Sequence, residues 1–238
     1  MLQGKKIIFF DMDGTLIDSV GIWNDVDRAL LTQLGTNPEH IDVQAQRDAM
    51  LRELNEAENP YVAYCGRLGQ KYSSDLSPEE IFHIRYQIAQ HYLIHVIDYK
   101  PGAEKVLKEM KDQGYLLILA TTTRRKNMEI YCTQNKNITA KASPLDYFTH
   151  IYTREDVKKI KPDPEIYLRI MEKQKVSPEE CLIFEDSLIG VEAANNAGIE
   201  AAVIYDRYSD GQREEINARA TYTFSNFTEV LAAIQKDE

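Results

Sequence analysis

Short, almost uninterrupted apolar runs are the feature of this sequence that most restricts its fold. They recur along the chain at residues 7–10, 115–120, 148–152, 181–184 and 201–205. Strands buried on both faces have this pattern, because neither face needs polar residues. Helical patterns lie between the later runs, as in the stripe Ala103, Val106, Leu107 and Met110. Alternating strands and helices predict an α/β fold with a parallel sheet and right-handed crossovers.

The segment from about residue 20 to residue 98 has a different pattern. It holds almost no strand-like runs, and its apolar residues recur at helical spacing, at Ile22, Val26 and Leu30 and again at Ile81, Ile84, Ile88 and Tyr92. An ordinary run of crossover helices is the alternative, but so long a crossover is unusual. We therefore expect residues 20–97 to form a helical cap domain. It would be inserted into a Rossmann-like core made of residues 1–19 and 98–238.

Two tetrapeptides of the same sequence predict where helices begin. Ser77-Pro78-Glu79-Glu80 and Ser177-Pro178-Glu179-Glu180 each combine a Ser cap, a Pro in the first helical position and a Glu three residues after the Ser. Further along, small residues recur at helical spacing at Gly190, Ala193, Ala194 and Ala197. A face this small predicts a helix that lies close against the sheet.

The charge and the cysteines of the chain argue against several classes of partner and site. The formal net charge is −10 at pH 7, whereas nucleic-acid-binding surfaces need clustered Lys and Arg. No stretch approaches the ~20 apolar residues of a membrane helix, and the run 7–10 is too short for a signal peptide. Cys65, Cys132 and Cys181 are too widely spaced for a disulfide framework or a zinc site. We expect a monomeric, cytoplasmic protein that binds neither nucleic acid nor a membrane.

Polar residues gather directly after the predicted strands. Three such segments are Asp11-Met12-Asp13-Gly14-Thr15, Thr121-Thr122-Thr123-Arg124-Arg125 and Glu185-Asp186-Ser187. The carboxyl ends of parallel strands meet at one edge of a sheet, where ligands bind. Carboxylates brought together there repel one another unless a cation joins them. Taken alone, Asp-x-Asp-Gly also suits an ordinary turn, or the start of a calcium loop whose later acidic ligand is missing here.

Together these segments resemble the four motifs of the haloacid dehalogenase-like superfamily. The matching positions, in the order and spacing of that family, are Asp11-Met12-Asp13-Gly14-Thr15, Thr121, Lys161 and Glu185-Asp186. The resemblance covers essentially the whole chain, cap included. It implies a phosphatase in which Asp11 is the nucleophile and Asp13 the general acid and base. Thr121 would hold phosphate oxygens, and Lys161 would supply positive charge.

The same resemblance implies that the enzyme depends on magnesium. The ligands would be the carboxylates of Asp11 and Asp186 and the backbone carbonyl of Asp13. Glu185 would be either a further ligand or a partner of these groups. Mg²⁺ prefers oxygen ligands and keeps several waters, which agrees with a site of few carboxylates.

We expect a small phosphorylated metabolite as the substrate, such as a sugar phosphate or phosphoglycolate. Backbone amides at Gly14 and Thr15, together with Thr122, are the candidates that bind its phosphate. Arg124 is a candidate for a second anionic group, although an exposed position at a helix start explains it equally well. Trp23 either lines the substrate pocket or belongs to the core of the cap. The sequence leaves the identity of the substrate open.

Two other functions compete with the phosphatase. A phosphomutase of the β-phosphoglucomutase type resembles this chain in its cap, both aspartates and the acidic pair. Those enzymes use a cap histidine and an Arg–Gly segment, but Trp23 stands near that histidine position and residues 42–59 hold no matching glycine. A non-catalytic binding protein on the same fold would be expected to lack Asp11, Asp13 or Lys161. The residues present therefore favour a hydrolase.

Overall fold

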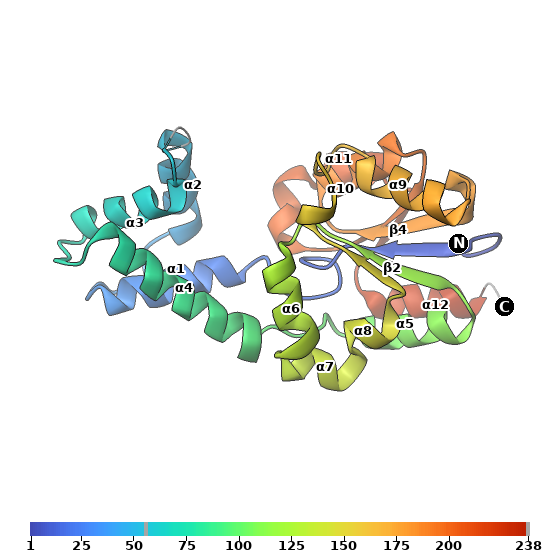
Figure 1. Cartoon of the computed structure of the whole chain (residues 1–238), viewed down its shortest axis with the longest axis horizontal. Coiled ribbons are helices and arrows are strands. Elements are labelled where there is room, and N and C mark those ends of the chain that lie inside the picture. Colours follow the sequence, from blue (N-terminus) through green and yellow to red (C-terminus); the bar gives the residue numbers. More distant parts are fainter. Residues whose placement is uncertain (55–56, 237–238) are drawn as a thin grey trace. The chain divides into compact units, whose positions relative to one another are not determined.

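The computed structural model describes residues 1–54 and 57–236. The chain divides into two compact units. The core unit comprises Met1–Val20 and Ile97–Glu238, and the helical unit comprises Gly21–Val96. Figure 1 shows strands in the core unit and helices throughout the other. Among the described residues, no helix is long and apolar enough to cross a bilayer.

A parallel sheet forms the centre of the core unit and confirms the predicted α/β fold. Its strands, as far as the chain is described, are β1 Ile7–Phe10, β2 Leu116–Ala120, β3 His150–Tyr152, β4 Cys181–Glu185, β5 Glu200–Ile204 and β6 Tyr222–Phe224. They lie in the order β3-β2-β1-β4-β5-β6, and each neighbouring pair is parallel. Every residue of β1 and β4 is buried. This burial explains why the two strands are apolar throughout, apart from Glu185 at the end of β4.

The register of the central strands determines which residues meet at the carboxyl edge. Phe10 of β1 is opposite Leu119 of β2 on one side and Phe184 of β4 on the other. The next residue, Asp11, still donates its backbone N–H to the carbonyl of Phe184 at 3.0 Å. The last residues of β2 and β4 and the first loop residues after β1 therefore lie side by side, as the sequence predicts for a parallel sheet.

Helices cover both faces of the sheet. They are α5 Ala103–Asp112, α6 Arg125–Thr133, α7 Lys136–Ala142, α8 Pro144–Tyr147, α9 Glu165–Gln174, α10 Leu188–Asn196, α11 Arg213–Arg219 and α12 Phe227–Lys236. Apolar residues of α9, α10 and α11 form one cluster with β1, β4 and β5. Helices α5 and α12 lie together on the opposite face (Figure 1). Short 3₁₀ helices span Arg154–Asp156, Pro178–Glu180 and Arg207–Gln212.

The core unit also holds the two segments that lead to and from the helical unit. Ile17 pairs with Tyr99 in an isolated antiparallel bridge. The backbone N–H of Lys100 donates to the carbonyl of Leu16 at 2.8 Å. The two segments are therefore joined by backbone hydrogen bonds next to the loop that follows β1.

The helical unit consists of α1 Ile22–Gln33, α2 Val43–Glu53, α3 Pro60–Lys71 and α4 Pro78–His95. The predicted helix start at Ser77 is present, because its side chain and that of Glu80 form a capping box at the beginning of α4. Inside the unit, Asp27 accepts hydrogen bonds from Arg85 at 2.7 Å and from Arg47 at 2.8 Å. The Arg85 guanidinium lies 5.1 Å from the centre of the Trp23 ring, which is a cation–π contact.

Candidate active site

A buried lysine connects two acidic residues at the carboxyl edge of the sheet. The ammonium of Lys161 donates to Asp11 Oδ1 at 2.7 Å and to Glu185 Oε1 at 2.6 Å. Asp11 follows β1, Glu185 ends β4, and Lys161 lies in the loop before α9. Only 7% of Asp11, 5% of Lys161 and 1% of Glu185 is exposed. The fold thus brings three of the four sequence motifs into direct contact across 150 residues of chain.

Glu185 is surrounded by hydrogen-bond donors. Besides Lys161 on Oε1, its Oε2 accepts from the backbone N–H groups of Asp186 and Ser187 at 3.1 and 3.3 Å, and from the Ser187 hydroxyl at 3.1 Å. Helix α10 approaches this carboxylate closely, because a Cβ atom at Gly190 would lie 1.9 Å from the Glu185 carboxyl carbon. Within the predicted small face of this helix, Gly190 leaves room for the Glu185 carboxylate, whereas Ala193, Ala194 and Ala197 pack in the apolar cluster with the sheet.

Asp186 lies beside this pair and has a single hydroxyl partner in the described contacts. Thr15 donates its hydroxyl to Asp186 Oδ1 at 2.7 Å. Burial, together with the charges of Glu185 and Asp11, holds the pKa of Asp186 well above its usual range. Burial also raises the pKa of Asp11 to about 7, although the charge of Lys161 opposes the rise. If Asp11, Glu185 and Asp186 were all ionised, they would carry more negative charge than one lysine neutralises.

This excess of carboxylates fits a divalent cation. Asp11, Glu185 and Asp186 are all buried. The Lys161 ammonium pairs with Asp11 and Glu185, whereas the hydrogen bond to Asp186 comes from the uncharged Thr15 hydroxyl. Within residues 1–54 and 57–236, no three acidic, histidine or cysteine side chains form a group that could hold a metal ion. Magnesium does not need such a group, because it is held in proteins by one or two carboxylates, water and substrate phosphate. The donors Asp11 and Asp186 therefore fit a magnesium ion.

The second aspartate of the first motif is held by hydroxyl groups. Ser19 donates to Asp13 Oδ1 at 2.6 Å, and Tyr131 donates to the same oxygen at 3.1 Å. The Thr123 hydroxyl donates to Asp13 Oδ2. Ser19 and Tyr131 were not among the residues that the sequence singled out. Ser19 follows the motif closely, but no pattern marks Tyr131, which lies within α6.

The glycine and threonine of the first motif lie against the metal candidate Asp186. Gly14 has φ +83°, and a Cβ atom built on it would lie 2.4 Å from Asp186 Oδ2. Thr15 is fully buried, and its hydroxyl is committed to Asp186. These positions make both residues part of the support of Asp186, whereas the sequence suggested contacts to substrate.

The other predicted residues lie in three different places. Thr121 is buried at the end of β2, and its hydroxyl accepts from the backbone N–H of Thr123 at 3.2 Å. Thr122 and Arg124 are exposed in the segment that begins α6. Trp23 lies in the helical unit, where it contacts Arg85.

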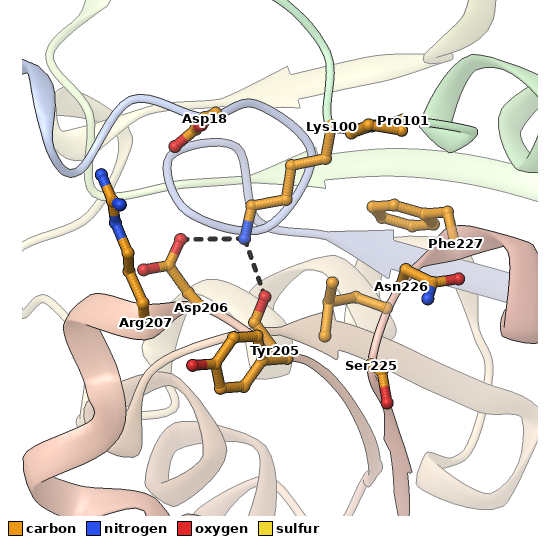
Figure 2. Close-up of a pocket in the computed structure, with 10 residues that line it drawn as sticks. Asp18, Lys100, Pro101, Tyr205, Asp206, Arg207, Ser225, Asn226 and Phe227 are labelled. Atoms are coloured by element: carbon orange, nitrogen blue, oxygen red, sulfur yellow. Dashed lines mark hydrogen bonds and ion pairs between the residues drawn. The ribbon is translucent and has the colours of Figure 1, made fainter.

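A hollow of about 330 Å³ lies where β5 ends, lined by residues other than Asp11, Lys161 and Glu185. Figure 2 shows Lys100 reaching across it to Asp206, with Asp18 and Arg207 at its side. The Lys100 ammonium donates to Asp206 Oδ2 at 2.8 Å and to the carbonyl of Tyr205 at 3.1 Å. This pair joins the segment that returns from the helical unit to the loop after β5. Nothing in the sequence pattern indicated it.

Comparison with known proteins agrees with this geometry. A family model described as haloacid dehalogenase-like hydrolase matches residues 8–204. The mitochondrial (DL)-glycerol-3-phosphatase 1 of Arabidopsis thaliana is 27% identical over 85% of this chain, which spans 65% of that protein. The phosphorylated carbohydrates phosphatase of Thermotoga maritima is 29% identical over 82% of both proteins. The crystal structure of a candidate beta-phosphoglucomutase from Thermotoga maritima has a TM-score of 0.77 at 26% identity, covering 97% of this chain and 99% of that one. The chain therefore belongs to the haloacid dehalogenase-like hydrolase family of enzymes, as its four motifs predicted.

Proposed function

We propose that the protein is a magnesium-dependent phosphatase that hydrolyses a phosphate monoester of a small metabolite through a phosphoaspartate at Asp11. The observation that carries the proposal is the buried lysine that bridges Asp11 and Glu185 next to Asp186. A buried carboxylate with one oxygen bound to an ammonium suits a nucleophile that must stay ionised. The names of the two phosphatase relatives favour a sugar or polyol phosphate.

In the first step, a carboxylate oxygen of Asp11 attacks phosphorus and the bond to the leaving alkoxide breaks. Lys161 holds Asp11 in place, and Glu185 in turn holds Lys161 through its second hydrogen bond. The ammonium offsets negative charge as it spreads over the phosphoryl oxygens. Thr121, at the end of β2, would bind one of these oxygens.

Asp13 would move the protons in both steps. It gives a proton to the leaving alkoxide when the phosphoaspartate forms. It then takes a proton from the water that attacks the phosphorus of the phosphoaspartate, which releases phosphate and restores Asp11. The hydroxyls of Ser19, Thr123 and Tyr131 hold the Asp13 carboxylate in position.

Magnesium would be bound by the carboxylates of Asp11 and Asp186 and by the backbone carbonyl of Asp13. When bound, it neutralises carboxylate and phosphate charge and so lowers the repulsion between them. Thr15 fixes the Asp186 carboxylate through its hydroxyl. Glu185 has its oxygens occupied by Lys161, Ser187 and backbone amides, so we assign it to holding Lys161 instead of the metal.

The residues that select the substrate are proposed from position alone. Thr122 and Arg124 are exposed next to the site residue Thr121. The backbone N–H of Gly14 already donates to the carbonyl of Ile17 at 3.0 Å, so of the two proposed amides that of Thr15 is the stronger candidate for a phosphate contact. Trp23 is the candidate from the helical unit, which we propose to be the cap domain. We also propose that the enzyme is a cytoplasmic monomer.

A phosphomutase is the second candidate, and the likeness to the candidate beta-phosphoglucomutase favours it. A mutase returns the phosphoryl group to the sugar, whereas a phosphatase gives it to water. Incubation with a sugar 1-phosphate and its bisphosphate separates the two outcomes. Release of inorganic phosphate without an isomerised sugar phosphate supports the phosphatase, and the reverse result overturns it.

The central experiment measures phosphate release from p-nitrophenyl phosphate and from a panel of phosphorylated metabolites with Mg²⁺. Asp11→Asn should reduce turnover by at least ~10³-fold, because the nucleophile is lost. Asp18→Asn is the matched control, since this carboxylate is exposed on the same loop, and it should keep wild-type turnover. Wild-type turnover in Asp11→Asn would overturn the proposed nucleophile.

A further inference from the structure

The Asp13 carboxylate has an asymmetric set of hydrogen-bond partners. Oδ1 accepts two hydroxyls, from Ser19 at 2.6 Å and from Tyr131 at 3.1 Å, whereas Oδ2 accepts the Thr123 hydroxyl. An oxygen with two donors is fixed in place, and the other oxygen is left to exchange a proton by displacing a single hydroxyl. The hydrogen bonds therefore distinguish the two oxygens of Asp13.

Tyr131 is the most buried of these three partners. It lies in helix α6 with 2% of its surface exposed, and its helix neighbours Ile130 and Cys132 are buried as well. A tyrosine ring moves about two side-chain torsions only, and a buried tyrosine hydroxyl normally needs a partner. Here that partner is Asp13, 118 residues earlier in the chain. Ser19, by contrast, lies in the loop that leads to the helical unit.

We propose that Tyr131 is a positioning residue for Asp13: its hydroxyl holds Oδ1 so that Oδ2 is the oxygen that exchanges protons with the leaving group and with water. This inference rests on the proposed role of Asp13 as acid and base. Tyr131 keeps its own proton throughout, and the proton that reaches the leaving oxygen comes from Asp13. Neither the sequence motifs nor the comparisons point to this residue.

If Tyr131 positions Asp13, its loss should affect poor leaving groups more than good ones. A purely structural role for Tyr131 predicts no such difference. A misplaced general acid slows the departure of a poor leaving group, because that oxygen needs a proton as its bond to phosphorus breaks. p-Nitrophenolate is a good leaving group and needs little such help, whereas phenolate is a poorer one. The parameter kcat/KM reports the steps up to phosphoenzyme formation, so it isolates the acid role.

The test compares Tyr131→Phe with the wild type on phenyl phosphate and p-nitrophenyl phosphate in the presence of Mg²⁺. The ring is kept, so the core of α6 stays filled. We expect kcat/KM for phenyl phosphate to fall about 10-fold or more, and that for p-nitrophenyl phosphate to fall less than about 3-fold. Tyr99→Phe is the matched control, since it removes another buried hydroxyl, which donates to the carbonyl of Ala142 at 2.7 Å. It should leave the ratio of the two kcat/KM values unchanged.

Some outcomes would overturn the role of Tyr131 alone, and another would overturn the proposed function. Equal losses on both substrates, or no loss, would overturn the positioning role while the phosphatase assignment stands. An Asp11→Asn variant with full activity would instead overturn the proposed function itself. A loss in Tyr131→Phe that tracks a drop in its thermal midpoint, and that Tyr99→Phe reproduces, would reduce Tyr131 to a structural residue.

Discussion

At the scale of single residues, the loop after β1 is shaped around Asp186. Gly14 combines a left-handed backbone conformation, φ +83°, with a position where an added Cβ would meet Asp186 Oδ2 at 2.4 Å and Val20 Cγ2 at 2.8 Å. The first constraint is conformational and the second is a close approach to a proposed metal ligand. The two constraints can be separated, because Gly114 has nearly the same φ, +86°, with nothing within 4 Å.

Replacing Gly14 and Gly114 separately by alanine distinguishes the effect of backbone strain from the effect of displacing Asp186. Gly114→Ala should lower the free energy of unfolding by about 1–2 kcal/mol, the cost of a left-handed alanine, and should leave kcat/KM unchanged. Gly14→Ala carries the same strain and also pushes on Asp186, so it should lose most of its activity. Urea unfolding and phosphatase assays on both variants check this. Full activity in folded Gly14→Ala would show that activity does not depend on the position of Asp186.

The carboxylates of the site predict a pH dependence for magnesium binding. Burial raises the pKa of Asp11 to about 7 when no metal is bound. A carboxyl group with a raised pKa in the folded state contributes stability at low pH, and that contribution is lost as the pH rises through about 7. Mg²⁺ binds the ionised form, so it should raise the thermal midpoint more at about pH 8 than at about pH 6. Differential scanning fluorimetry with EDTA or Mg²⁺ measures both shifts.

Asp186→Asn is the control for that titration. It keeps the shape of the site but removes one proposed ligand, and its midpoint should respond much less to Mg²⁺ at either pH. EDTA should abolish the phosphatase activity of the wild type, and added Mg²⁺ should restore it. A midpoint shift that is the same at both pH values and in both proteins would place magnesium binding elsewhere.

At the scale of secondary-structure elements, helix α10 is adapted to the end of strand β4. A Cβ atom at Gly190 would lie within 1.9–2.2 Å of the Glu185 carboxylate. Gly190→Ala must therefore move the helix or Glu185, and through Glu185 also Lys161. We expect a loss of about 1–3 kcal/mol in unfolding free energy, together with a fall in kcat. Gly211→Ala, with open space around the same kind of substitution, should change neither.

The elements that could be predicted from the sequence are those whose burial leaves a local pattern. Strands β1 and β4 were found because both of their faces are buried. Strand β6 was missed, because Tyr222–Phe224 is short and only partly buried. The helix start predicted at Ser177 is present, but its capping box begins only the short 3₁₀ helix Pro178–Glu180, since β4 begins at the next residue. The same local signal at Ser77 begins an 18-residue helix.

In the site, too, the sequence predicts contacts that follow from strand register but not those that depend on how helices and loops pack. Asp11 and Asp186 directly follow strands and Glu185 ends one, so the register of a parallel sheet brings them together without further information. The contact between Tyr131 and Asp13 depends on how α6 packs after β2. The pairing of Lys100 with Asp206 depends on two loops. Such contacts arise only in the folded chain and leave no spacing for a sequence pattern to reveal.

At the scale of the whole molecule, the two units have separate interiors. The helical unit has its own apolar cluster, which includes Leu30, Tyr64 and Leu68. It also has its own buried ion pairs, in which Asp27 serves both Arg85 and Arg47. Trp23 is the single tryptophan of the chain and lies in this unit against Arg85. Tryptophan fluorescence therefore reports the unfolding of the helical unit, while amide exchange in β1 and β4 reports the core unit.

Helix α1 carries two aspartates that form ion pairs, one of them buried and the other exposed. Asp27 is 1% exposed, whereas Asp25 pairs with Arg28 on the surface of α1 at 3.0 Å. Asp27→Asn leaves Arg85 buried without its carboxylate, so it should lower the unfolding free energy seen by Trp23 by about 3–5 kcal/mol. Asp25→Asn should cost no more than ~1 kcal/mol. Amide exchange in β1 and β4 should change little in either variant, because the core unit keeps its own contacts.

Equal shifts for the two variants in Trp23 fluorescence would mean that the buried pairs do not stabilise the helical unit. An equal loss of protection in β1 and β4 would mean that the two units unfold as one.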